Sequence, residues 1–186
     1  DERKIVARRA ALELFPGAIC NIGSGISTGQ PPVAAEEGVL DRIVLTNEQG
    51  LIGGAPSSDA GAARNYSAIV DQPYQFDFYD GGGVELAFLS AAEIDAEGNV
   101  NVSRFADKIV GIGGFVNISQ NAKKVIFSGT FTAGGLKVSA GGGRLRIQTE
   151  GKHRKFVKAV QQICFNGRVG ASRGQEVVYV TERAVF

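Results

Sequence analysis

Residues 18–32, AICNIGSGISTGQPP, contain the clearest indication of the fold class. Residues 18–22 predict a short buried strand, and a glycine-rich turn, residues 23–32, follows directly. A helix can begin near Pro31 and Pro32, because proline suits a first helical turn, and Gly38 is expected to end it. A strand, a glycine turn and a helix in this order are typical of an α/β fold.

A second predicted strand ends in a carboxylate. Residues 43–46, IVLT, are mostly β-branched and apolar, as expected of a central strand that is covered on both faces. They lead directly into NEQG, residues 47–50. Open α/β sheets place ligands and chemistry at the carboxyl ends of strands. Glu48 is therefore a candidate base, nucleophile or metal ligand, and a plain surface turn is the alternative interpretation.

The remaining patterns complete one domain over residues 1–186. Asp1 is a plausible N-cap for a helix that extends to about Leu14, before Pro16 and Gly17 stop it. The run from Tyr74 to Tyr79 leads into three glycines. Other patterns predict a hairpin of residues 86–94 with 100–102, a strand at residues 123–128, and a hairpin of residues 136–138 with 145–147. We expect an open, mostly parallel sheet with flanking helices and added β-hairpins.

Composition excludes several classes of function. Hydrophobic residues make up 44% and charged residues 21%, as in an ordinary soluble globular protein. The net charge of +1 provides no field for nucleic acid or anionic lipid, so neither is expected as a partner. No apolar run is long enough to cross a bilayer, and the charged start does not fit a signal peptide, which favours a cytoplasmic protein. The absence of methionine suggests a piece of a longer chain.

Metal and redox chemistry have little support. Cys20 and Cys164 are distant in sequence and are expected to be buried apolar fillers. The only histidine, His153, stands in the basic stretch KHRK, residues 152–155, which predicts a solvated turn rather than a ligand cluster. A Ser-His-Asp triad would need the same histidine. We therefore expect no metal site.

Two glycine-rich turns offer free main-chain amides. GSGIST, residues 23–28, has Thr28 where a dinucleotide-binding fingerprint needs its third glycine, and no Lys-[Ser/Thr] pair follows it. GIGGF, residues 111–115, is a second such turn, and it precedes a polar stretch, residues 117–120, that can form a helix. Glycine lets the main chain approach a ligand closely, so either turn can hold an anion or an oxyanion. For the first turn, a simple chain reversal is the other interpretation.

These segments together resemble the family I CoA-transferases, and most of all the single-chain propionate and acetate CoA-transferases. The similar motifs occur in order along nearly the whole chain: residues 21–26 (NIGSGI), 47–50 (NEQG) with Gly53 and Gly54, 75–83 (QFDFYDGGG), 111–119 (GIGGFVNIS), 131–137 (FTAGGLK) and 179–186 (YVTERAVF). Each glycine motif is weak by itself, and their combination is strong.

The resemblance implies a function and a set of site residues. The chain would be the C-terminal, glutamate-bearing half of a two-domain CoA-transferase, with the fold that sugar-phosphate isomerases share, and it would be inactive without the N-terminal half. Glu48 would form a glutamyl-CoA thioester in a ping-pong reaction between a short-chain acyl-CoA and a carboxylic acid. The implied roles are oxyanion binding by amides near Gly113 and Gly114, CoA binding by Gly23, Gly25, Gly111 and Lys137, and a substrate pocket with Gln75, Phe78 and Gly82.

The resemblance also sets expectations about partners and alternatives. Coenzyme A would be a substrate, with no separate cofactor, and a homo-oligomer is expected. A sugar-phosphate or acyl-CoA binding module of the same fold is one alternative function. An acyl-CoA hydrolase is the other, since it would release acid and CoA without an acceptor.

Overall fold

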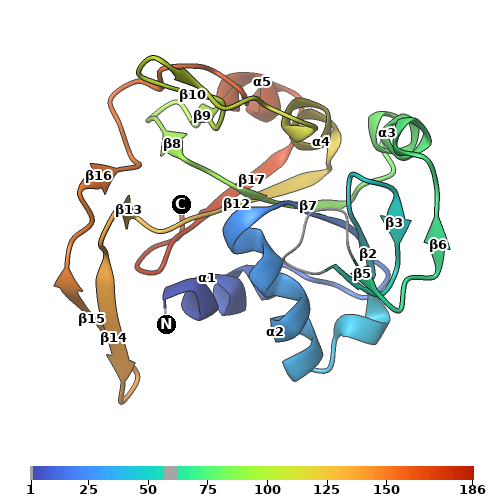
Figure 1. The fold of residues 1–186 in the computed structure, drawn as a ribbon, viewed down its shortest axis with the longest axis horizontal. Helices are drawn as coiled ribbons and strands as arrows, with labels where there is room; N and C mark the ends of the chain where they lie inside the picture. Colours follow the sequence, from blue (N-terminus) through green and yellow to red (C-terminus); the bar gives the residue numbers. More distant parts are fainter. Residues whose placement is uncertain (1, 57–62) are drawn as a thin grey trace.

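The computed structural model describes residues 2–56 and 63–186 and shows an α/β domain built on one seven-stranded sheet (Figure 1). The strands of this sheet are β1 (Ile19–Ile22), β2 (Val44–Thr46), β3 (Leu51–Ile52), β6 (Ala68–Ile69), β7 (Leu86–Ser90), β12 (Lys124–Ser128) and β17 (Glu176–Val180). Their order is β17-β12-β7-β1-β2-β3-β6. From β17 to β2 the neighbours run parallel, and β3 and β6 continue the sheet antiparallel. The predicted open, mostly parallel sheet is confirmed.

Helices cover both faces of the sheet. The helices are α1 (Glu2–Ala11), η1 (Gly25–Gly29, 3-10), α2 (Gln30–Glu36), η2 (Leu40–Arg42, 3-10), α3 (Gln72–Asp80), α4 (Phe115–Asn121) and α5 (Gly167–Ser172). In Figure 1, α1 and α2 lie on one face, and α4 and α5 lie on the other. None of the helices in the described ranges is both long and apolar enough to span a membrane.

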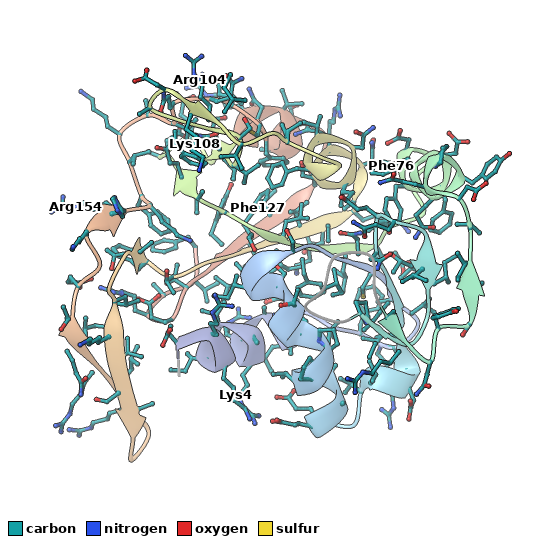
Figure 2. The ribbon with its side chains drawn as sticks, viewed as in Figure 1. Lys4, Phe76, Arg104, Lys108, Phe127 and Arg154 are labelled. Carbon is teal, nitrogen blue, oxygen red and sulfur yellow. The ribbon has the colours of Figure 1, made fainter. Side chains whose placement is uncertain are left out.

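The central strands are buried on both faces because their side chains alternate between two apolar layers. Leu86 and Phe88 of β7 pack with Val6 of α1, whereas Ala87 and Leu89 pack with Phe127 on the side of α4 and α5. Phe127 is 1% exposed and contacts three other aromatic rings, and Figure 2 shows it in the interior. Cys20 and Cys164 are buried free thiols, as predicted.

Small antiparallel pairs decorate the sheet. They are β4 (Ala55–Pro56) with β5 (Ala63–Arg64), β8 (Glu93–Ile94) with β9 (Val100–Asn101), β10 (Arg104–Phe105) with β11 (Lys108–Ile109), β13 (Thr132–Ala133) with β16 (His153–Arg154), and β14 (Lys137–Gly141) with β15 (Arg144–Thr149). The predicted hairpin around residues 141–143 is thus confirmed. In Figure 1 it projects away from the sheet.

Three predicted boundaries need correction. The strand predicted at residues 86–94 divides after Ser90, because β7 is already paired on both edges, with β1 and β12, and only β8 is left to form the hairpin with β9. The first helix ends at Ala11 rather than near Leu14, because the next residues bond three rather than four positions back. Strand β2 is not covered throughout, since Val44 is 38% exposed. The proposed N-cap, Asp1, lies outside the described residues.

Candidate active site

A cavity of about 460 Å³ lies at the carboxyl ends of three parallel strands. Its walls come from the ends of β1, β2 and β7 and from the segment around the start of α4. The chain leaves β1 toward β2 on one side, and β7 lies on the other side of β1. The cavity therefore occupies the point where the strand order reverses, which is where open α/β sheets bind ligands.

Glu48 lies in this cavity, on the tight turn between β2 and β3. Gly50 closes the turn by donating its amide to the carbonyl of Asn47 at 3.1 Å. Its φ of +104° and its contact with Val70 leave no room for a side chain, since a Cβ there would collide with the Val70 carbonyl oxygen. The glycine after the carboxylate is therefore a steric requirement of this turn.

The main-chain amide of Gly114 lies close to the Glu48 carboxylate. Burial raises the pKa of Glu48 above its ordinary value, and the Gly114 amide opposes that shift. Among the described residues no lysine or arginine forms an ion pair with Glu48. This carboxylate is less strongly hydrated than it would be in water, and the amide donor beside it is neutral. It therefore has the environment of a nucleophile or base.

The Gly113–Gly114 turn stands directly over the carboxylate. A Cβ on Gly114 would lie 2.5 Å from Glu48 Oε2 and would also collide with Phe76 Cζ, and one on Gly113 would lie 3.7 Å from Glu48 Oε1. Phe76, labelled in Figure 2, belongs to α3. Gly111 also lines the cavity. The structure therefore brings Glu48 together with three of the glycines singled out from the sequence.

The glycine turn after β1 forms the opposite wall. Gly23 lines the cavity, and Ser90, at the end of β7, holds this turn by accepting the Ile26 amide at 3.2 Å and donating to the Ser24 carbonyl at 2.7 Å. Gly25 has a φ of +84°, and a Cβ there would lie 2.7 Å from Ser90 Oγ. Close approach of two chain segments therefore explains both glycines of this turn.

A buried polar cluster lies behind the Glu48 turn. The hydroxyl of Tyr79 accepts from the side-chain amides of Asn21 and Gln75, at 3.1 and 3.0 Å, and lies 2.7 Å from Thr46 Oγ1. Gln75 also donates to the carbonyl of Asn47 at 3.1 Å. All five side chains are at most 5% exposed. Burial is the largest cause of a raised pKa at Tyr79, so the phenol stays protonated.

Four residues assigned from the resemblance lie elsewhere. Lys137 is exposed on β14, and Gly82 is exposed in the turn after α3. Phe78 is 42% exposed and packs against Gly83. Gln75 is buried behind the Glu48 turn and does not line the cavity. For these four, a direct role in binding CoA or substrate has no support in this geometry.

Sequence reasoning did not single out Asn21, Tyr79 and Ser90. Asn21 stands near the carboxyl end of a predicted strand, which is the same signal that identified Glu48, so it could have been found. Ser90 could not, because the strand predicted there continued to residue 94 and only the structure ends it at Ser90. Tyr79 lies four residues after Gln75 on helix α3, which was not predicted because glycines follow it directly. Side chains four residues apart share one face of a helix.

Much of the remaining cavity wall is apolar. Its hydrophobic members are Ile22, Leu89, Val102, Val110, Ile112, Phe115 and Ile118. Such a lining, with a few polar groups that converge on one point, is typical of a small-molecule site.

The predicted solvated stretch, residues 152–155, is exposed except at its last member. Lys155 Nζ donates to the carbonyl of Ala91 at 2.9 Å, and burial lowers the pKa of this lysine. His153 is exposed. Within residues 2–56 and 63–186, no three His, Cys, Asp or Glu side chains gather as metal ligands would.

Fold and cavity together define an α/β domain with a partly buried carboxylate beside main-chain amides. No protein-family model matches the chain. Over its full length it is 49% identical to the acetate CoA-transferase YdiF of Escherichia coli O157:H7, across 188 residues, and 43% identical to the caffeate CoA-transferase of Acetobacterium woodii, across 192 residues. It covers 35% of the first protein and 36% of the second, so the chain spans about a third of these relatives.

Solved structures agree with the sequence relationship. The crystal structure of the acyl-CoA transferase YdiF apoenzyme from Escherichia coli O157:H7 matches 100% of this chain and 36% of its own, with a TM-score of 0.94 and 49% identity. The decarboxylase AibA/AibB matches 99% of this chain and 72% of its own, with a TM-score of 0.69 but 19% identity, which shows the fold alone. Over about a third of their length, proteins named as CoA-transferases are thus similar to this chain in sequence, and an acyl-CoA transferase is similar to it in fold.

Proposed function

We propose that the chain is the glutamate-bearing, C-terminal half of a CoA-transferase and that Glu48 is its nucleophile. The observation that carries the proposal is the Glu48 carboxylate, with a raised pKa, beside the Gly114 amide inside a cavity at the carboxyl ends of the strands. Two relatives at 49% and 43% identity are named CoA-transferases. A related YdiF structure, 48% identical, is described as a thioester complex with CoA.

The proposed reaction has four balanced steps. The Glu48 carboxylate attacks the thioester carbonyl of the donor, which forms a mixed anhydride and expels the CoA thiolate. The thiolate attacks the glutamyl carbonyl of the anhydride, which forms a glutamyl-CoA thioester and releases the donor acid as its carboxylate. The acceptor carboxylate then attacks this thioester, again expelling the thiolate, and the thiolate finally attacks the acyl carbonyl of the new anhydride and frees Glu48.

The residues around the cavity supply what these steps need. Each tetrahedral intermediate places negative charge on an oxygen, and amides of the Gly113–Gly114 turn lie within reach of the carboxylate. Loss of one such donor costs about 10²–10³ in rate. The glycine turn at Gly23 and Ser24 provides a backbone surface for CoA, whereas Gly25 packs against Ser90 and does not line the cavity. The apolar wall suits an acyl group.

The experiment uses the longer protein that we propose to contain this chain. It is incubated with acetyl-CoA, digested, and analysed by peptide mass spectrometry for a CoA adduct on the peptide that contains Glu48. Glu48→Ala should abolish the adduct and the transfer. Glu97→Gln, a change in an exposed ion pair with Arg168, should leave both unchanged. Absence of the adduct in the wild type contradicts the proposal.

The same preparation separates the alternatives. A hydrolase would release CoA without an acceptor carboxylate, and a sugar-phosphate binding module would be stabilised by a phosphorylated sugar whether or not Glu48 is present. We expect neither result, and we expect the 186-residue chain by itself to transfer no CoA.

A further inference from the structure

We propose that the Tyr79 cluster, defined as Asn21, Thr46, Gln75 and Tyr79, is a positioning device that fixes Glu48 against Gly114. The inference rests on the proposed function of Glu48 and extends it to residues that do not touch the reacting atoms. Its centre is the Tyr79 hydroxyl, which is joined to three polar side chains at 2.7 to 3.1 Å.

The donor and acceptor of each hydrogen bond at the Tyr79 hydroxyl can be assigned in only one way. The side-chain amides of Asn21 and Gln75 each donate to the Tyr79 oxygen, which fills its two acceptor positions. Thr46 Oγ1 donates its proton to the carbonyl of Cys20 at 2.9 Å, so the short contact between Thr46 and Tyr79 must carry the tyrosine proton. Every polar position of the Tyr79 hydroxyl is therefore occupied, and the group has a single orientation.

Gln75 transmits this order to the catalytic turn. Its Nε2 has two hydrogens, and the partners of that nitrogen are the Tyr79 oxygen and the carbonyl of Asn47, the residue directly before Glu48. Asn47 is held further by its side chain, which accepts the Leu51 amide at 3.1 Å. The peptide that carries Glu48 is thus fixed from behind, while the side chain faces the cavity.

Helix α3 links the two halves of the site. Gln75 and Tyr79 lie four residues apart on one face of α3 and hold the Glu48 turn, whereas Phe76 of the same helix contacts the Gly114 segment. The position of α3 consequently sets the separation between carboxylate and amide. A cluster that only filled space would not need polar side chains, since buried polar groups cost free energy unless they are hydrogen-bonded.

Tyr79→Phe tests the inference, because it removes the central oxygen and keeps the ring. Tyr179→Phe is the control: Tyr179 is a partly buried tyrosine that packs against the core, its hydroxyl donates to the Gly98 carbonyl at 2.6 Å, and it stacks on Phe127 away from the Glu48 turn. In the longer protein, we measure the rate of adduct formation on the Glu48 peptide with acetyl-CoA, the KM for acetyl-CoA, the melting temperature, and hydrogen exchange of the peptide that covers residues 45–52.

We expect Tyr79→Phe to slow adduct formation by about 10²-fold, since small misplacements of a reacting group have that effect. The KM should stay within about twofold, and exchange of residues 45–52 should accelerate. Tyr179→Phe should lower the melting temperature and leave the rate and the local exchange unchanged. Thr46→Val removes one hydrogen-bond partner of Tyr79 and keeps the shape of the side chain. Its rate of adduct formation and its exchange of residues 45–52 should lie between those of Tyr79→Phe and the wild type.

Two outcomes overturn the inference. If Tyr79→Phe melts earlier but its folded fraction forms the adduct at the wild-type rate, the cluster is only structural and the proposed function stands. If the wild type itself forms no adduct, the proposed function fails and the inference fails with it. A variant too unstable to assay is replaced by Thr46→Val, judged by the same rate and exchange measurements.

Discussion

Gly114 lies against the carboxylate of Glu48, and this contact joins two turns that are distant in the sequence. It brings the carboxylate and the nearest amide donor to one point of the cavity. Because Gly114 is buried and packed against Phe76 as well, its position leaves little freedom to the carboxylate.

Alanine at Gly114 should displace the carboxylate. The φ of −80° at Gly114 is accessible to alanine, so the expected damage comes from the Cβ, which would lie 2.5 Å from Glu48 Oε2. We expect a loss of about 10²-fold in adduct formation, measured by mass spectrometry in the longer protein. Gly141→Ala is the control, since a Cβ there meets nothing within 4 Å, and an equal loss in both variants would contradict the prediction.

The acidic limb of the pH profile should lie higher than an ordinary glutamate allows. The nucleophile must be ionised, and burial raises the pKa of Glu48 above 4.5. The value of kcat/KM for acyl-CoA should therefore fall as the pH drops through that raised pKa, because it reports groups of the free enzyme. The limb is measured over the range in which circular dichroism shows the protein folded. A midpoint at or below 4.5 would count against this environment for Glu48.

Glu48→Gln should stabilise the fold at neutral pH. A folded pKa above the unfolded one means that folding favours the protonated form, so the charged carboxylate costs stability at pH 7 and the cost disappears as the pH falls toward 4.5. Glutamine removes that cost, and each unit of such a pKa shift corresponds to about 1.4 kcal/mol. Urea unfolding of the 186-residue chain at pH 7 and at pH 4.5 should show a gain that shrinks at the lower pH. A gain of the same size at both values would refute the electrostatic reason.

Gly50→Ala should be far more harmful than Gly38→Ala. Both glycines have positive φ, so both substitutions carry the backbone penalty of about 1–2 kcal/mol. A Cβ on Gly38 meets nothing within 4 Å, whereas one on Gly50 would collide with the Val70 carbonyl oxygen. We expect Gly50→Ala to lose at least about 2 kcal/mol more, a loss characteristic of severe overpacking, by urea unfolding. Equal losses in the free energy of unfolding would show that the turn around Glu48 adjusts to an added Cβ without further cost.

Short-range sequence patterns were sufficient to predict those features that depend only on residues close together in the chain. The strand at Ile19–Ile22, its glycine turn and the following helix were predictable because each depends on neighbouring residues: apolar runs, glycine and proline. Glu48 could be identified for the same reason, since a polar residue that ends an apolar strand is visible in the sequence. The segment 86–94 was predicted incorrectly as one strand, because where a strand divides depends on which neighbours already pair with it.

The α/β class, the carboxylate at a strand end and the glycine turns could all be predicted from the amino-acid sequence, because they follow from short-range periodicity and backbone freedom. The tertiary structure alone decided that Gly114 reaches Glu48, that Gln75 supports the turn from behind, and that Lys137 lies on a distant hairpin. The reason is physical: contacts between segments far apart in the chain depend on strand order and helix packing, which short-range sequence patterns do not record.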